Sequence, residues 1–102
     1  MPTVVYKEFE WDSKKAERNF FIHGIRFEEA ATVFSKPFYY ATSFVHTDNE
    51  LRYVAVGMWE DMEITVVYTV RKKHKRIISA RCSRDYEKEY YRDYLSKIKA
   101  NC

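Results

Sequence analysis

The spacing of apolar positions predicts two helices in the first third of the chain. Residues 12–23 begin at Asp12, a favourable N-cap, and are followed by Gly24, which can adopt the left-handed conformation of a C-cap. Residues 26–35 carry apolar side chains at i, i+3, i+4 and i+7, which form one face of a helix. These side chains are Phe27, Ala30, Ala31 and Phe34. We expect the two helices to pack together on one face of a sheet.

From residue 38 onward the pattern changes to short aromatic and β-branched runs separated by polar turns, as in strands. The connections are short, which predicts antiparallel pairing of neighbouring strands. The expected strands, in their order across the sheet, are 38–46, 52–60, 64–71 and 76–82. Residues 4–10 have the composition of one further short strand.

Residues 83–100 form a third predicted helix, with Ser83 as its N-cap. Tyr91 falls on the packed face of this helix, and Tyr90 lies nearer the edge of that face. The complete pattern predicts a single α+β domain over residues 1–102. Its centre would be an antiparallel sheet of four strands, or five with the N-terminal strand, with two N-terminal helices and a C-terminal helix.

Composition narrows the class of protein without indicating a reaction. The 102 residues are 46% hydrophobic and 32% charged, a balance typical of a globular domain. No apolar run is long enough to span a bilayer, and the N-terminus lacks the basic and apolar regions of a signal peptide. Two cysteines, Cys82 and Cys102, are too few for a disulfide framework. We therefore expect a reduced, cytoplasmic protein.

Basic side chains are concentrated in the last third of the chain. Residues 1–70 hold 7 Lys and Arg against 11 Asp and Glu, a net charge of −4. Residues 71–102 hold 11 against 4, a net charge of +7. One face with this charge would attract a polyanion such as nucleic acid. The alternative is a solvated basic surface that binds nothing.

The chain offers arginines rather than metal ligands for chemistry. His23, His46 and His74 lie far apart and lack the spacing of a metal site, so we expect no metal and no cofactor. Guanidinium groups bind phosphate in a bidentate way and stabilise charge that develops at phosphorus. Aromatic rings among them can stack on bases. The arginines on or beside the predicted strands are Arg52, Arg71, Arg76, Arg81 and Arg84.

Residues 9–34, FEWDSKKAERNFFIHGIRFEEAATVF, resemble the opening of the BrnT family of toxins. RYVAVG (52–57), VVYTVR (66–71) and RIISAR (76–81) resemble strands of that family, and YEKEYY (86–91) resembles its final helix. The resemblance implies a RelE-like fold and the toxin of a type II toxin–antitoxin system, a ribonuclease that needs no metal. It also implies a partner, an antitoxin with a ribbon-helix-helix DNA-binding region.

Two positions depart from the family pattern. The family usually has a second basic residue after the arginine matched by Arg81, whereas this chain has Cys82. We expect Cys82 to be buried as a small hydrophobic residue. A thiol cannot replace a guanidinium in phosphate binding. This leaves an alternative function, an antitoxin-binding corepressor that binds nucleic acid or its partner without cleavage. Arg26 stands where the family often has a serine that would start a capping box with Glu29.

The resemblance implies a reaction in which the 2′-hydroxyl attacks the adjacent phosphorus. It makes Arg81 the expected catalytic residue, which stabilises the charge on the phosphate with help from Arg52 or Arg71. Strand alternation places Arg81 on one face together with Ile77 and Ser79. From the residues alone, a surface or salt-bridging role for Arg81 is the competing interpretation. The expected RNA-binding residues are Lys72, Lys73, Lys75, Arg76, Arg84 and Tyr90.

Overall fold

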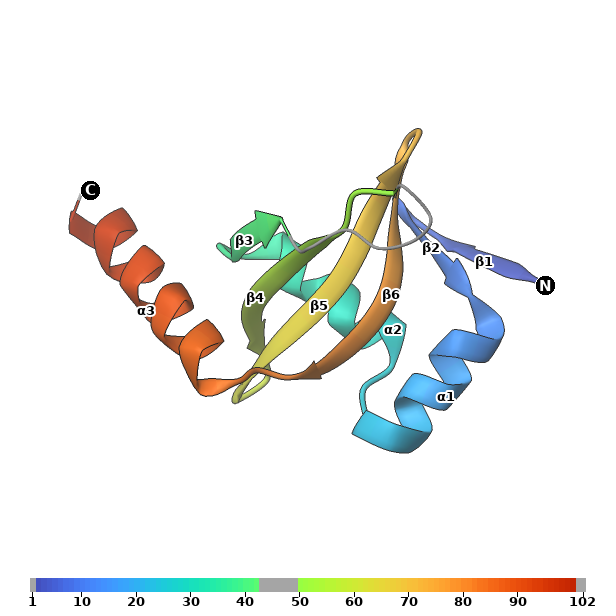
Figure 1. Cartoon of the computed structure of the whole chain (residues 1–102), viewed down its shortest axis with the longest axis horizontal. Helices are drawn as coiled ribbons and strands as arrows, with labels where there is room; N and C mark the ends of the chain where they lie inside the picture. Colours follow the sequence, from blue (N-terminus) through green and yellow to red (C-terminus); the bar gives the residue numbers. More distant parts are fainter. Residues whose placement is uncertain (1, 43–49, 101–102) are drawn as a thin grey trace.

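The computed structural model describes residues 2–42 and 50–100, which form one sheet with helices beside it (Figure 1). The strands are β1 (Thr3–Tyr6), β2 (Phe9–Asp12), β3 (Tyr39–Thr42), β4 (Tyr53–Trp59), β5 (Met62–Arg71) and β6 (His74–Cys82). The helices are α1 (Ser13–His23), α2 (Phe27–Ala30), its 3₁₀ continuation η1 (Ala31–Ser35) and α3 (Asp85–Ala100). None of the described helices is both long enough and apolar enough to cross a membrane.

The sheet is mixed and has six strands in the described part of the chain, in the order β1-β2-β6-β5-β4-β3. The prediction of an antiparallel sheet with four or five strands is therefore wrong. The N-terminal segment predicted as one strand turns at Lys7, whose φ is 56°, and becomes the hairpin β1–β2. β2 then runs parallel to β6, where Phe9 pairs with Lys75 and Glu10 with Arg76. A parallel pair needs a long crossover, which the elements from α1 to β5 supply.

The order of the other four strands follows the prediction. β3, β4, β5 and β6 pair antiparallel in sequence order. The predicted strand 38–46 is described only as far as Thr42, and its remaining residues lie outside the described part. The second predicted helix is α-helical only over α2 and continues as the 3₁₀ helix η1. Half of its capping box survives, because the Glu29 carboxylate accepts a hydrogen bond from the Arg26 N–H at 2.8 Å.

Helix α1 has the predicted caps and one anchor that the sequence pattern did not reveal. Asp12 Oδ1 accepts a hydrogen bond from the Lys14 N–H at 2.9 Å, and Gly24 is left-handed with a φ of 73°. Asn19 is buried in the middle of the helix. Its amide group exchanges two hydrogen bonds of 3.0 Å with the backbone of Ala80. These bonds fasten α1 to β6 and satisfy a buried polar side chain.

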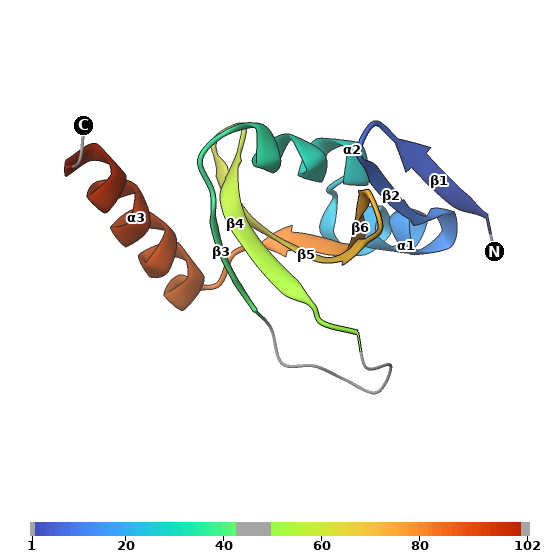
Figure 2. The ribbon, with the colours of Figure 1, turned by 90° about the horizontal axis from the view of Figure 1, so that it is seen from above.

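The core lies between one face of the sheet and the N-terminal helices. Trp11 and Phe27 are almost completely buried and meet edge-on, with 5.7 Å between ring centroids. Gly57 allows β4 to approach η1 closely, because an added Cβ would lie 2.6 Å from Val33 Cγ1. In Figures 1 and 2, α1 lies beside β1 and β2, whereas α3 projects from the opposite end of the molecule.

The opposite face of the sheet, which we call the outer face, carries the candidate site. On β5 it holds Thr65, Val67, Thr69 and Arg71, because alternate side chains share a face. A β-bulge interrupts this alternation on β6: Ser79 pairs with Val67, but Ile77 pairs with the next residue of β5. Ile77 is therefore buried in the core. The prediction that Ile77 shares a face with Ser79 and Arg81 is wrong.

Candidate functional site

The predicted site residues lie at two separate ends of the outer face. Arg81 pairs with Thr65 across β5 and β6, whereas Arg71 pairs with His74 at the hairpin that joins these strands. Arg71 follows Thr65 by six positions, which is about 20 Å at about 3.3 Å per residue. The structure therefore does not bring Arg71 to a phosphate that Arg81 could contact.

We call these two groups the helix end, where α3 begins, and the hairpin end, where β5 turns into β6. The helix end holds Arg81, Arg84 and Tyr90. The hairpin end holds Arg52, Arg71, Lys72, Lys73 and Arg76. Arg52 belongs there because Tyr53, the next residue, pairs with Tyr68. Lys75 is directed to the core face, since its Nζ lies 5.5 Å from the centroid of the Phe34 ring.

At the helix end, a buried carboxylate holds Arg81. Arg81 Nη1 donates to Glu87 Oε1 at 2.8 Å, and Nη2 donates to Oε2 at 2.9 Å. The side chain of Glu87 is 5% exposed and that of Arg81 is 20% exposed. The hydrogen bond with Glu87 raises the pKa of Arg81. The arrangement is a bidentate, largely desolvated ion pair between β6 and the first turn of α3.

Glu87 receives further hydrogen bonds from two other groups. Its Oε1 accepts from Thr65 Oγ1 at 3.0 Å and from the Arg84 N–H at 2.8 Å. Burial raises the pKa of Glu87, but the bonds from Arg81, Arg84 and Thr65 outweigh burial, so the pKa lies below its ordinary value. Glu87 is therefore an ionised anchor for Arg81 and is poorly suited to accept a proton.

The predicted N-cap of α3 is wrong. The helix begins at Asp85, so Arg84 occupies the N-cap position, and the Glu87 carboxylate binds its N–H as in one half of a capping box. Ser83 precedes the cap, and its Oγ lies 2.8 Å from Thr65 Oγ1. The serine hydroxyl therefore joins the buried network around Glu87 instead of capping the helix.

Arg81 keeps one pair of donors for a ligand. Its bonds to Glu87 use the end of the guanidinium, and Nη1 also faces the Cys82 carbonyl oxygen at 3.4 Å. Within residues 2–42 and 50–100, no hydrogen bond uses Arg81 Nε. The Nε–H and the second Nη2–H thus form an unused fork along the side of the guanidinium. A phosphate can occupy such a fork in a bidentate way, and a cleft of about 330 Å³ lies against this residue.

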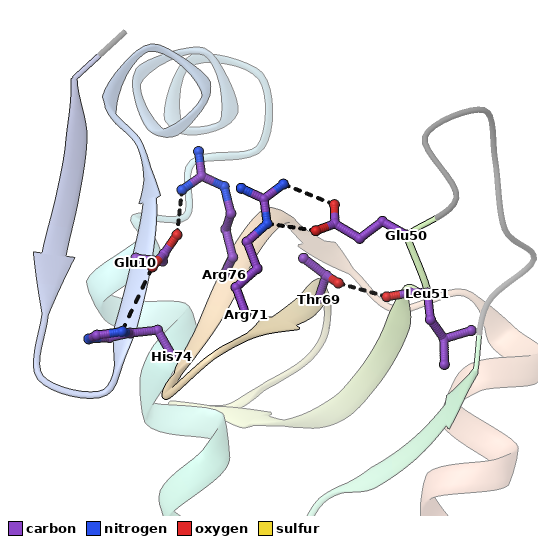
Figure 3. Close-up of polar contacts among 7 residues, drawn as sticks. All are labelled: Glu10, Glu50, Leu51, Thr69, Arg71, His74 and Arg76. Atoms are coloured by element: carbon purple, nitrogen blue, oxygen red, sulfur yellow. Dashed lines mark hydrogen bonds and ion pairs between the residues drawn. The ribbon is translucent and has the colours of Figure 1, made fainter.

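At the hairpin end, Arg71 and Arg76 also pair with carboxylates but differ in exposure (Figure 3). The Arg76 side chain is 20% exposed, like that of Arg81. Arg71 donates through Nε and Nη2 to Glu50 at 2.6 and 3.0 Å, and its side chain is 47% exposed. Arg76 Nη1 donates to Glu10 Oε2 at 2.6 Å, and His74 Nδ1 lies 3.8 Å from the other oxygen of that carboxylate. Figure 3 shows Arg71 and Arg76 extending side by side from their strands. This end is a basic surface with two carboxylates embedded in it.

The chain itself crosses the outer face between the two ends. Thr69 Oγ1 donates to the Leu51 carbonyl oxygen at 2.7 Å (Figure 3), and Thr69 is 1% exposed. This contact covers β5 at Thr69, two residues before Arg71. The helix end and the hairpin end are therefore separate surfaces on the same pair of strands.

Cys82 is exposed, so the prediction of a small buried hydrophobe is wrong. It follows Arg81 on β6 and pairs with Ile64, a residue of the core face. Strand alternation directs Cys82 and Arg81 to opposite faces. A basic residue at position 82 would therefore not add a second guanidinium beside Arg81. Cys102 lies outside the described residues.

Among the described residues, which exclude His46, no group of three His, Cys, Asp or Glu side chains could hold a metal ion.

Comparison with known proteins gives the family. The family model described as ribonuclease toxin, BrnT, of type II toxin-antitoxin system matches residues 11–87. The chain belongs to the BrnT family. It is therefore a ribonuclease toxin with an antitoxin partner. No curated protein matches the chain.

The BrnT match includes a residue that reasoning from sequence missed, Glu87. A local signal for it exists, because Arg84 and Glu87 repeat the spacing of Arg26 and Glu29 at the start of α2. In both helices the glutamate side chain accepts a hydrogen bond from the backbone of the arginine three positions earlier. That repeated pattern would have placed a carboxylate at the start of α3, but not its contact with Arg81.

Proposed function

We propose that this BrnT toxin cleaves RNA without a metal at the helix end of the outer face. In this reaction the 2′-oxygen forms a bond to the adjacent phosphorus, and the bond from phosphorus to the next 5′-oxygen breaks. The 2′-hydroxyl gives up its proton and the 5′-oxygen takes one up, with water as the carrier. The products carry a 2′,3′-cyclic phosphate and a 5′-hydroxyl. Arg81 stabilises the negative charge on the phosphate oxygens in the transition state.

The unused fork of Arg81 is the observation that carries this proposal. Glu87 fixes the guanidinium by its other end. Arg81 therefore loses little conformational freedom when a phosphate binds. Glu87 also offsets part of the charge of Arg81, and Arg84 supplies a second cation at the same cleft. A phosphate in the cleft would thus meet a positioned donor pair and a net positive charge.

The hairpin end holds the RNA away from the bond that is cleaved. Along β5, Arg71 lies about 20 Å from Arg81, and Arg76, which pairs with Thr69, lies about 13 Å away. These cations therefore contact other phosphates of the same strand. Exposed lysines and arginines bind a nucleic-acid backbone through charge and counterion release, without reading its sequence. The residues assigned to this role are Arg52, Arg71, Lys72, Lys73 and Arg76.

RNA cleavage in the presence of EDTA tests the assignment. Arg81→Ala should reduce the cleavage rate by about 10²-fold or more, the usual effect of removing a donor to a developing oxyanion. Arg81→Lys should restore only part of the activity, because an ammonium lacks the planar fork. Circular dichroism establishes that each variant is folded. Cleavage by folded Arg81→Ala at the wild-type rate would show that Arg81 is not catalytic.

Arg92→Ala is the matched control for loss of an arginine. Arg92 also makes a bidentate contact with a carboxylate, Glu63, at 2.7 and 2.9 Å, but its side chain is 66% exposed and does not line the cleft. Its removal should leave cleavage unchanged. Cys82→Arg should also change cleavage little, because position 82 faces away from Arg81.

We also propose that the antitoxin carries a ribbon-helix-helix region and covers the arginine-bearing outer face. The net charge of +7 over residues 71–102 favours an acidic or amphipathic segment of the partner at this face. Co-purification with the product of the neighbouring gene tests the pairing, and the complex should not cleave RNA. A complex that forms but still cleaves RNA at full rate would place the partner on another surface.

The ion pair supports one alternative function. Because Glu87 neutralises Arg81, the pair can serve the fold alone, and the chain would then act as a corepressor that binds its antitoxin without cleaving RNA. Under that alternative, neither the wild type nor Cys82→Arg cleaves RNA in EDTA, while both bind the antitoxin. Cleavage by the wild type that Arg81→Ala abolishes excludes it.

A further inference from the structure

The cleft at the helix end has an apolar floor that a phosphate does not need. It occupies about 330 Å³ between α3 and strands β3, β4 and β5. Its floor consists of small aliphatic side chains on three neighbouring strands: Ala41, Val54, Val56 and Val67. Ala41 and Val54 are paired across β3 and β4, and Val54 and Val67 across β4 and β5. The floor is therefore a continuous apolar surface next to two arginines.

Three tyrosines form the wall of the cleft. Tyr90 stacks on Tyr39, with 5.7 Å between centroids and 14° between ring planes. Tyr86 stands edge-on to Tyr90, at 6.4 Å and 85°. Tyr86 is 52% exposed and Tyr90 is 56% exposed, so both rings remain accessible. The stack on Tyr39 fixes Tyr90, and the two exposed rings meet as a corner beside the apolar floor.

We propose that this cleft is a pocket for one nucleobase of single-stranded RNA. The base lies on the valine floor with one face against Tyr86 or Tyr90, while its phosphate meets Arg81 and Arg84. A flat, largely apolar base matches the floor and wall, and the adjoining anion matches the arginines. The inference rests on the proposed ribonuclease function and adds to it a substrate class, single-stranded RNA. In a duplex, neighbouring bases cover the faces of each base, so a duplex could not stack on these tyrosines.

The pocket should accept any of the four bases. The neutral hydrogen-bonding side chains on its lining are those of Thr42, Tyr39, Tyr86 and Tyr90, whose hydroxyls both donate and accept and so do not select one base edge. The Glu87 carboxylate is occupied by Arg81, Arg84 and Thr65. Stacking therefore dominates, and stacking is tolerant of sequence. Purines, which have the larger rings, should bind somewhat more tightly than pyrimidines.

A non-cleavable oligoribonucleotide measures binding separately from cleavage. Full 2′-O-methylation removes the attacking hydroxyl, and 2-aminopurine placed at successive positions reports stacking by loss of its fluorescence. In an oligonucleotide short enough to bind in one register, one position should be quenched on binding. An abasic residue at that position should weaken binding to the wild-type protein about tenfold, as expected for loss of one stacked base. This arm needs no protein variant, so misfolding cannot affect it.

Protein variants locate the contact. Tyr86→Leu and Tyr90→Leu should each weaken binding of the single strand about tenfold and reduce the quenching. Tyr40→Leu is the matched control, since Tyr40 follows Tyr39 on β3, faces the other side of the sheet and is 60% exposed. It should bind like the wild type. Annealing the oligonucleotide to its complement should abolish the difference between Tyr86→Leu and the wild type.

The outcomes separate this inference from the proposed function. If the wild type cleaves RNA but no abasic position and neither tyrosine variant affects binding, the base pocket is wrong and the ribonuclease assignment stands. If quenching and the tyrosine effects appear while no RNA is cleaved in EDTA, the pocket is correct and the metal-independent reaction is wrong. Equal losses for Tyr40→Leu and Tyr86→Leu would also refute the pocket, because they would reflect a general effect on the fold.

Discussion

The two ends of the outer face use the same residue types, arginine and glutamate, in opposite geometries. At the helix end, Glu87 binds the end of the Arg81 guanidinium and leaves its side fork unused. At the hairpin end, Glu50 binds Arg71 through that side fork, Nε and Nη2. The side chain of Glu87 is 5% exposed, whereas that of Glu50 is 23% exposed. Arg81 can therefore bind a phosphate through its side fork while it keeps both hydrogen bonds to Glu87. Arg71 must first release Glu50 before a phosphate can bind at the same fork.

Burial decides what each pair contributes to stability. Breaking a buried ion pair leaves a charge without compensation, at a cost of about 3–5 kcal/mol. Exposed pairs contribute about 0–1 kcal/mol, because water and salt screen them. The Arg81–Glu87 pair should therefore couple the site to the fold, whereas the Arg71–Glu50 pair should exchange its contacts with little effect on the fold. This difference can be tested at matched positions.

The largest expected effect is that of Glu87→Gln compared with Glu50→Gln. Glu87→Gln should lower the free energy of unfolding by about 3 kcal/mol, near the lower limit for a buried pair because Arg81 retains some contact with water. Glu50→Gln should cost less than about 1 kcal/mol. Urea denaturation followed by circular dichroism measures both. Equal losses would show that burial does not distinguish the two ends.

Acid should weaken the helix end selectively. The pKa of Glu87 is lowered in the folded state by its hydrogen bonds, so it binds its proton more weakly there than in the unfolded chain. The resulting stability is present above the ordinary glutamate pKa of about 4.3 and is lost as the pH falls through the lowered value. The wild type should therefore lose more stability than Glu87→Gln as the pH falls below about 5. Parallel curves for the two proteins would contradict this assignment.

Much of the local structure could be predicted because its causes are local. Asp12 and Gly24 mark the ends of α1 by capping chemistry alone. The short turns after β4 and β5 fix the antiparallel order of β4, β5 and β6. The parallel pairing of β2 with β6 could not be predicted, because it joins Phe9 to Lys75 across most of the chain. The hairpin before it was missed since its turn at Lys7 lacks glycine, asparagine and proline.

The candidate site was predictable in one half only. The position of Arg81 near the end of a strand, together with the family resemblance, placed it in the site. Glu87 was missed because its role depends on where α3 begins relative to β6, which is a tertiary relation. The separation of Arg71 and Arg52 from Arg81 was missed for a similar reason, since sequence shows that residues share a sheet but not their distance along it.

Removing a hairpin-end cation should affect binding of RNA but not the chemical step. Arg71→Ala should reduce the dependence of log K on log salt concentration by about 0.7, the value for one phosphate contact on a single strand. The cleavage rate at saturating RNA should stay at the wild-type value, because Arg71 does not reach the phosphate at Arg81. Fluorescence anisotropy at several salt concentrations and single-turnover cleavage measure the two quantities. A fall in the saturated rate would place Arg71 in the catalytic step.

The smallest expected effects come from two turns, one at each end of the sheet. Lys72, at the hairpin end, and Glu60, between β4 and β5, adopt φ values of 53° and 54° without being glycine. The left-handed conformation costs a residue with a side chain about 1–2 kcal/mol. Replacement by glycine removes this cost, but the greater conformational freedom of glycine in the unfolded state offsets part of the stabilisation. Lys72→Gly and Glu60→Gly should each stabilise the protein by about 0.5 kcal/mol and raise Tm by about 2–4 °C. Only Lys72→Gly should also weaken RNA binding, because it alone removes a cation from the hairpin end. Weaker binding by both variants would mean that the turns affect RNA through the fold, and that charge at the hairpin end is not what holds the strand.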